Sequence, residues 1–258
     1  MAGPKAFADV LETLPLTEAG RLVPSSRIAP PTASLKPLNQ WKMEEDDAPI
    51  FQFFYRAFQP RRHLEFGTWE GWGTVLCLEA CDATVWTINL SAGEIRPDGT
   101  WAYGHRVFDT SNAPEEVISE TFGEDELGPR TYHRTDAGGY IGRLYREKGL
   151  SHRVCQIYCD SREWDTSNYP EGFFDSVLID GGHQAEVVIS DTRKALPLVR
   201  SGGLMIWHDF CPLPEMCSQF ESIQGVTQGL QALLPEMHHQ MARLSWIDPS
   251  WILVGIKK

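Results

Sequence analysis

From residue 63 onward, short apolar runs alternate with stretches of helical periodicity, and no other feature constrains the fold as strongly. The run FFDSVLID at 173–180 is almost continuously apolar, as a parallel strand buried on both faces should be. Strands that alternate with helices predict a parallel sheet covered by helices on both faces. The predicted strands of this unit are 63–67, 84–90, 153–160, 173–180 and 204–209.

Glycine, proline and apolar periodicity mark the helices between these strands. We predict helices over 48–60, 71–82, 183–196 and 221–235, with Pro197 ending the third. Two further apolar stretches, MARLSWI and SWILVGIKK, flank an Asp-Pro dipeptide, which indicates a C-terminal antiparallel strand pair. The predicted fold class is therefore α/β, with a mostly parallel sheet and a mixed edge.

The chain divides into an N-terminal arm and one α/β domain. Four prolines between residues 24 and 37 exclude a long helix, so we predict that residues 1–47 form an extended arm that covers an active site, reaches a partner subunit or stays mobile. Residues 48–258 suit one large domain. The segment 91–138 is too long for an ordinary connection and carries aromatic and histidine side chains, which favours a substrate lid over a surface insertion.

Charge and composition exclude several classes of partner. The formal charge of −12, from 23 Lys and Arg against 35 Asp and Glu, repels phosphate backbones and argues against a nucleic-acid partner. The first residues lack a secretory pattern, and no apolar stretch approaches the ~20 residues of a membrane helix. The six cysteines form no CxxC pair, which is typical of reduced, mostly buried thiols. We therefore expect a cytoplasmic protein with no membrane partner.

The segment HLEFGTWEGWGT, residues 63–74, joins the first predicted strand to the first helix of the sheet. In open α/β sheets ligands bind beyond the carboxyl ends of the strands, and glycines there let backbone approach a ligand closely. A dinucleotide turn needs G-x-G-x-x-G, and that pattern fails after Gly71 and Gly73. The pattern present is E-x-G-x-x-x-G, made of Glu65, Gly67 and Gly71.

The acids of this turn point to a positively charged ligand. An acid at the end of the first strand would repel a diphosphate, but it would attract an ammonium or sulfonium group. S-adenosylmethionine carries both groups. We therefore predict an S-adenosylmethionine site at this edge of the sheet.

Two segments, LEFGTWEG and FDSVLIDGGHQAEVVISDTRKALPLVRSGGLMIWHDF, carry a family resemblance that runs from about residue 48 to the C-terminus. The sequence resembles class I S-adenosylmethionine-dependent methyltransferases, and it is most similar to bacterial O-methyltransferases that modify sugars and other small natural products. The resemblance implies a Rossmann-like, doubly wound, mostly parallel sheet of seven strands. It also implies methyl transfer to a hydroxyl of a small molecule.

The resemblance assigns cofactor roles by position. Asn89 stands where this fold usually has an acid that holds the ribose hydroxyls, and Glu70 or Glu94 could compensate for the missing carboxylate. Asp160 and Ser161 match the position that touches the adenine amino group, and Asp180 falls beside the transferred methyl. The full set of implied cofactor-binding residues is Glu65, Gly67, Thr68, Glu70, Gly71, Asn89, Asp160, Ser161 and Asp180.

Four polar side chains meet at the far strand ends, namely Asp180, His183, His208 and Asp209. Methyl transfer is a direct displacement, so the protein must position the nucleophile and remove its proton. His183 is a candidate base because its ordinary pKa suits the task; capping of the following helix is the alternative. His208 is a second candidate, unless it only packs between its neighbours.

Asp180 and Asp209 also raise the question of a metal. Related O-methyltransferases hold a divalent ion, Mg²⁺ or another metal, with carboxylates from these two strand ends. Those enzymes commonly add an Asp or Asn directly after the second position, where this chain has Phe210. The third ligand could be His183 or His208, although Mg²⁺ prefers oxygen.

Two other functions stay open. One is a catalytically weak S-adenosylmethionine-binding protein, which the unusual Asn89 favours. The other is a nicotinamide-dependent oxidoreductase, which the missing phosphate turn argues against. A homodimer contact could form through the arm or through the aromatic face of helix 48–60.

Overall fold

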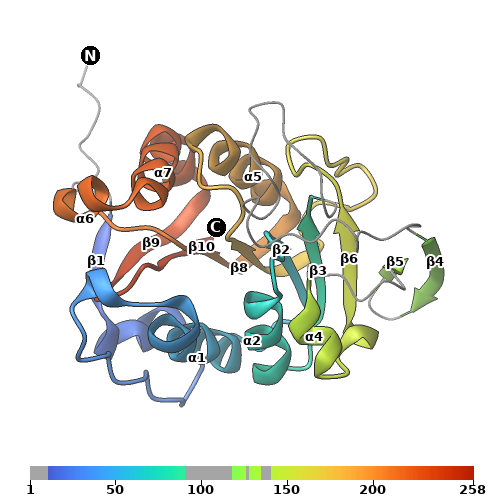
Figure 1. Cartoon of the computed structure of the whole chain (residues 1–258), viewed down its shortest axis with the longest axis horizontal. Helices are drawn as coiled ribbons and strands as arrows, with labels where there is room; N and C mark the ends of the chain where they lie inside the picture. The colour runs from blue at the N-terminus through green and yellow to red at the C-terminus, as the bar shows by residue number, and fades with distance from the viewer. Residues whose placement is uncertain (1–10, 91–117, 126–127, 135–140) are drawn as a thin grey trace.

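A mixed eight-stranded sheet runs through the protein, with helices packed on both of its faces (Figure 1). The structure is a computed structural model, and it describes residues 11–90, 118–125, 128–134 and 141–258. The strands of the large sheet are β1 (Glu12–Pro15), β2 (Arg62–Phe66), β3 (Thr84–Asn89), β6 (Val154–Tyr158), β7 (Phe174–Ile179), β8 (Val199–Trp207), β9 (Met241–Asp248) and β10 (Leu253–Lys257).

The strand order is β1-β9-β10-β8-β7-β2-β3-β6. Strands β6, β3, β2, β7 and β8 are parallel to their neighbours in that order, whereas β10 is antiparallel to both β8 and β9. This arrangement confirms the predicted Rossmann-like sheet with its C-terminal antiparallel pair. The chain order reverses at β2, which pairs with β3 on one side and with β7 on the other, so a crevice is expected at the carboxyl ends of these strands.

The four predicted helices are present with shifted ends. The helices are α1 (Ala48–Phe58), α2 (Trp72–Ala80), α4 (Arg143–Glu147), α5 (Ala185–Leu198), α6 (Pro214–Gln219) and α7 (Glu221–Gln240). Of the predicted ones, α1 and α2 are shorter than predicted, α5 begins two residues later and includes Pro197, and α7 is longer. Helix α7 continues five residues past Pro235, where we expected it to end. Leu233, Leu234 and Met237 are buried in this region, and their packing offsets the backbone hydrogen bond that proline cannot donate.

The described part of the N-terminal segment is attached to the sheet. Strand β1 adds an eighth strand parallel to β9, and the buried side chains of Leu14, Leu16 and Leu22 belong to the core. Two 3₁₀ helices, Leu16–Leu22 and Leu38–Gln40, and one π-helical turn, Met43–Asp47, follow the strand. The segment thus contains more secondary structure than an extended arm, and the domain boundary after residue 47 stays a prediction.

The segment 91–138 is described only at β4 (Ile118–Asp125) and β5 (Gly128–Arg134). These two strands form a separate antiparallel sheet beyond the β6 edge of the large sheet (Figure 1). The rest of the predicted substrate lid lies outside the described residues, so its role stays a prediction. None of the helices within the described ranges is long and apolar enough to cross a membrane.

Candidate active site

A cavity of about 870 Å³ lies where the carboxyl ends of β2, β3, β7 and β8 meet. That volume is in the range of sites for cofactors and small molecules. The predicted site residues in its wall are Gly67, Thr68, Asn89, Ser161, Asp180, His183, His208 and Asp209. The predicted residues outside its wall are Glu65, Glu70, Gly71 and Asp160.

Glycine at position 67 is required by the close approach of two strand ends. The backbone of Gly67 has φ +96°, a left-handed conformation that side chains disfavour. A Cβ at this position would also collide with the carbonyl group of Asp180. The turn after β2 can therefore lie directly against the end of β7, where the cavity opens.

Asn89 shapes the same turn from the neighbouring strand. Its Oδ1 accepts hydrogen bonds from the backbone N–H groups of Thr68 (3.1 Å) and Trp69 (3.0 Å). Its Nδ2 donates to the carbonyl of Leu90 at 2.9 Å. A carboxylate could accept the first two bonds but could not donate the third, so the amide fits this position better than the acid expected there.

Glu65 lies beneath the turn and away from the cavity. Its buried carboxyl accepts hydrogen bonds from the hydroxyls of Thr74 and Thr87, the latter at 2.6 Å. The other oxygen, Oε1, has no hydrogen-bond partner among the described residues. Burial raises the pKa of Glu65 to about 8, so the group is mostly neutral at pH 7.

Two other predicted acids have basic partners. Glu70 forms an ion pair with Arg143 of α4 at 2.9 Å, and Asp160 pairs with Arg162 at 2.6 Å. The acids that face the cavity nearest the predicted chemistry are instead Asp180 and Asp209. Acids at the ends of β7 and β8 therefore border the cavity, whereas Glu65 and Glu70 of the turn region do not.

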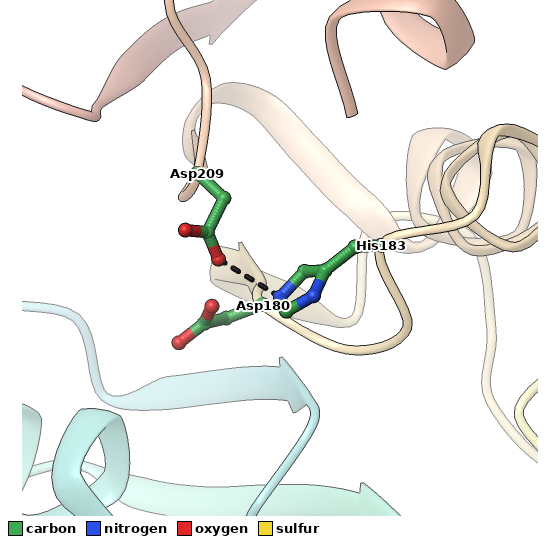
Figure 2. A group of neighbouring side chains, drawn as sticks. All are labelled: Asp180, His183 and Asp209. Carbon is green, nitrogen blue, oxygen red and sulfur yellow. Dashed lines mark ion pairs between the residues drawn. The ribbon is translucent and has the colours of Figure 1, made fainter. Parts of the chain in front are cut away.

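Asp180, His183 and Asp209 converge at the cavity wall (Figure 2). His183 follows β7, and its Nε2 lies 2.9 Å from Oδ2 of Asp209. Asp209 follows β8 and has a left-handed φ of +53°, which turns its side chain out of the strand direction. The His183 side chain is 47% exposed, so an incoming substrate can reach it.

His208 lies behind this group with both ring nitrogens engaged. Its Nδ1 is 3.2 Å from Oδ1 of Asp180 and 3.4 Å from Oδ2 of Asp209. Its Nε2 is 3.1 Å from Oδ2 of Asp47, a fully buried carboxyl that precedes α1. A ring held on both sides cannot turn to take a proton from a substrate, so the geometry favours a supporting role for His208.

The histidines and carboxylates of this site shift one another's pKa values. Burial alone would lower the pKa of His208 and of His183, but the carboxylates beside each ring raise both pKa values above the ordinary one. Burial raises the pKa of Asp180 and of Asp47. For Asp209 burial acts in the same direction, but the two imidazoles prevail and hold its pKa well below the usual range.

Asp180, His183 and Asp209 also have the chemistry of a metal site. One ligand atom from each lies within 4.8 Å of the others. Two carboxylates and one imidazole fit a divalent ion that accepts mixed oxygen and nitrogen donors, such as Mn²⁺ or Zn²⁺, better than Mg²⁺. Phe210, which directly follows Asp209, is fully buried and offers no oxygen ligand.

The N-terminal segment forms part of the cavity wall; covering an active site is one of the alternatives predicted for it, but the sequence patterns did not indicate which residues would do so. Its contribution consists of Asn39, Trp41, Lys42, Met43 and Glu44. Phe220 and Trp251 add aromatic side chains from the C-terminal half. These residues lack a motif, because their meeting depends on where the segment packs against the domain.

Residues 64–210 match the profile of a methyltransferase domain. No curated protein sequence matches the chain significantly. A Staphylococcus aureus protein assigned as a caffeoyl-CoA O-methyltransferase is structurally similar, with a TM-score of 0.52, 13% identity, and coverage of 94% of this chain and 90% of that chain.

Two other solved structures have lower TM-scores. An O-methyltransferase family protein from Burkholderia thailandensis has a TM-score of 0.50 and 13% identity, with coverage of 82% of this chain and 55% of that chain. An O-methyltransferase from Bacillus cereus, solved in complex with SAH, has a TM-score of 0.48 and 15% identity, with coverage of 88% and 84%. At such identities the similarity establishes the fold alone. The domain match covers more than half of the chain, and the chain therefore belongs to the methyltransferase-domain family.

Proposed function

We propose that this protein transfers a methyl group from S-adenosylmethionine to a hydroxyl of a small molecule. The observation that carries the proposal is the His183–Asp209 pair, with 2.9 Å between Nε2 and Oδ2, at the wall of a cavity beside the glycine turn. Family membership supplies the reaction class. A sugar or another natural product is the acceptor class that the resemblance favours.

The cofactor would lie at the side of the cavity formed by the turn after β2. Gly67, Thr68, Asn89 and Ser161 are the predicted cofactor residues that face this space. The carboxylates of Asp180 and Asp209 would stabilise the positive sulfonium group. Asn89 would act on the cofactor through the turn that it holds, because its Oδ1 already accepts two backbone N–H groups.

The His183–Asp209 pair can supply the base. With Nε2 donating to Asp209, the tautomer leaves Nδ1 of His183 free to accept a proton, as in other histidine–aspartate pairs. The acceptor oxygen forms a bond to the methyl carbon while the carbon–sulfur bond breaks, and its proton passes to His183. The products are a methyl ether and S-adenosylhomocysteine.

A divalent ion is an alternative that the donor set permits, because a metal-bound His183 could not also take the proton. Asp180, His183 and Asp209 would hold the ion, and when bound it would lower the pKa of the acceptor hydroxyl. Chelation tests this alternative. If the ion is required, EDTA abolishes methyl transfer and Mn²⁺ or Zn²⁺ restores it; full activity after thorough chelation and desalting would reject it.

Thermal melting with S-adenosylmethionine, S-adenosylhomocysteine and NAD tests the cofactor. We expect the first two to raise the melting temperature and NAD to leave it unchanged, because only a ligand of the folded state stabilises it. Transfer of a radiolabelled methyl group to a panel of sugars and phenols then tests the reaction. Cofactor binding without transfer to any acceptor would favour the weak binding protein, and a shift with NAD alone would favour the oxidoreductase.

A further inference from the structure

The π-helical turn Met43–Asp47 brings a buried carboxylate underneath the candidate active site. This turn lies outside the part of the chain that matches the methyltransferase domain, residues 64–210. Its last residue, Asp47, has no exposed surface, and it reaches a histidine 161 positions further along the chain. Burying a carboxyl group costs free energy unless the group is hydrogen-bonded, so Asp47 needs polar partners inside the protein.

The contacts of Asp47 lead to His208. One carboxyl oxygen, Oδ2, lies 3.1 Å from Nε2 of His208, and the other accepts a 3.4 Å hydrogen bond from the backbone N–H of Trp251. The ring of Phe51, on the first turn of α1, packs against the imidazole with 5.5 Å between ring centroids. The orientation of the His208 ring is therefore set from behind by residues of the N-terminal half.

The opposite edge of the same ring touches the site. Nδ1 of His208 lies 3.2 Å from Asp180 and 3.4 Å from Asp209. Asp209 in turn holds His183. One continuous chain of contacts thus connects Asp47, through His208, to both carboxylates and to the candidate base.

We propose that Asp47 is a positioning residue, which acts through His208 to set the placement of the Asp180 and Asp209 carboxylates for methyl transfer. This inference rests on the proposed function. It assigns a role in the site to an N-terminal segment that also forms part of the cavity wall through residues 39 and 41–44. The packing of this N-terminal segment against the domain would therefore form part of the cavity wall and also hold the reacting groups in place.

The substitution Asp47→Asn tests the role, because it keeps the shape and one acceptor oxygen but removes the charge. We expect kcat to fall about 10- to 100-fold, the usual effect of removing an outer partner of a site histidine. The dissociation constant of S-adenosylhomocysteine, measured by calorimetry, should stay within about twofold, since Asp47 does not line the cavity. Asp46→Asn is the matched control: Asp46 is also buried, but its carboxylate faces Lys36 and the backbone of Lys42.

A double-mutant cycle with His208→Asn separates positioning from a general loss of stability. If Asp47 acts only through His208, the double variant is no slower than the His208→Asn variant alone. Losses of kcat that multiply would overturn the proposal, as would Asp47→Asn with wild-type kcat. If Asp47→Asn does not fold, Asp47→Glu replaces it in the cycle, with the same criterion.

A second readout does not depend on turnover. In ¹⁵N spectra of the histidine rings, Asp47→Asn should shift the resonances of both His208 and His183, whereas a shift confined to His208 would contradict the connection to the site. A wild-type protein that methylates no acceptor would speak against the proposed function. Wild-type methyl transfer that Asp47→Asn leaves unchanged would speak against the positioning role alone.

Discussion

At the scale of single residues, β2 buries two titratable side chains two positions apart, His63 and Glu65. His63 contacts the hydroxyls of Ser176 (2.7 Å) and Tyr55 (3.3 Å), and burial lowers its pKa to about 3. Burial raises the pKa of Glu65 to about 8. Each group is therefore kept neutral inside the sheet at pH 7, and each makes stability depend on pH with the opposite sign.

The sign for Glu65 follows from its two pKa values. The folded state keeps a proton that the unfolded state releases near the ordinary pKa of 4.5, so the free energy of unfolding falls as pH rises from about 4.5 to about 8. His63 acts oppositely: its folded pKa lies below the ordinary 6.5, so it adds stability as pH rises from about 3 to about 6.5. Only a comparison between variants separates the two contributions.

We predict that Glu65→Gln removes the loss of stability that Glu65 causes at high pH. The free energy of unfolding, measured with urea at pH 5, 7 and 9, should rise in the variant relative to the wild type by a few kcal/mol between the lowest and the highest pH. Between pH 4.5 and 8 this relative gain is at most about 1.4 kcal/mol per pH unit. Glu79→Gln, at an exposed position, serves as the control. Parallel stability curves for Glu65→Gln and the wild type would contradict the raised pKa.

A second prediction at this scale concerns the candidate base. His183→Ala should lower kcat by about 100-fold or more, the usual contribution of a positioned base. Binding of S-adenosylmethionine, measured by calorimetry, should remain nearly unchanged. His152→Ala is the control, because His152 is exposed and does not line the cavity. Normal turnover of His183→Ala would remove His183 from the mechanism.

At the scale of elements, the turn between β2 and α2 is held from three sides. Asn89 of β3 binds its backbone N–H groups from one side, and the backbone of Asp180 after β7 lies against Gly67. From the third side, the backbone N–H of Gly142, just before α4, donates to the carbonyl of Trp69 at 2.6 Å. The conformation of this turn is thus a property of three strands and one helix together.

We predict that Gly67→Ala is strongly destabilising, because it combines a left-handed φ with a collision against backbone. The expected cost is about 2–5 kcal/mol in the free energy of unfolding, from backbone strain and overpacking together. Urea unfolding measures it. The control is Gly20→Ala, since a Cβ at Gly20 would have open space around it. Equal stability of the two variants would contradict the close approach of the turn to β7.

At the scale of the whole molecule, the N-terminal segment belongs to the same structure as the sheet. Strand β1 extends the sheet beyond β9, and Leu14 is fully buried there. Farther along, Trp41 lines the cavity and Asp47 supports His208. The fold and the candidate site therefore both depend on chain that precedes the matched methyltransferase domain.

We predict that Leu14→Ala lowers the free energy of unfolding by about 2–5 kcal/mol, as expected for a truncated core leucine. Leu35→Ala should change it by less than about 0.5 kcal/mol, because the side chain of Leu35 is fully exposed in the same segment. Thermal or urea unfolding of both variants makes the comparison. An equally small effect at both positions would show that the segment does not contribute to the core.

Local patterns were sufficient for much of this protein. Apolar periodicity is a property of neighbouring residues, so it located the strands and helices, and the glycine turn after the first strand located the edge that carries the site. The same patterns brought Asp180, His183 and Asp209 to one edge, because parallel strands end together. The sequence by itself therefore determined the fold class and the neighbourhood of the chemistry.

Only the tertiary structure decided which side chains face the cavity. A strand pattern does not show whether the Glu65 side chain points to a ligand or to buried threonines. In the folded protein it contacts Thr74 of α2 and Thr87 of β3. The roles of Asn89 in the turn and of Asp47 behind His208 join residues that are far apart in sequence. Such contacts depend on how the elements pack against one another, and local periodicity does not encode that packing. The packing decides which residues only support the site and which can touch a substrate.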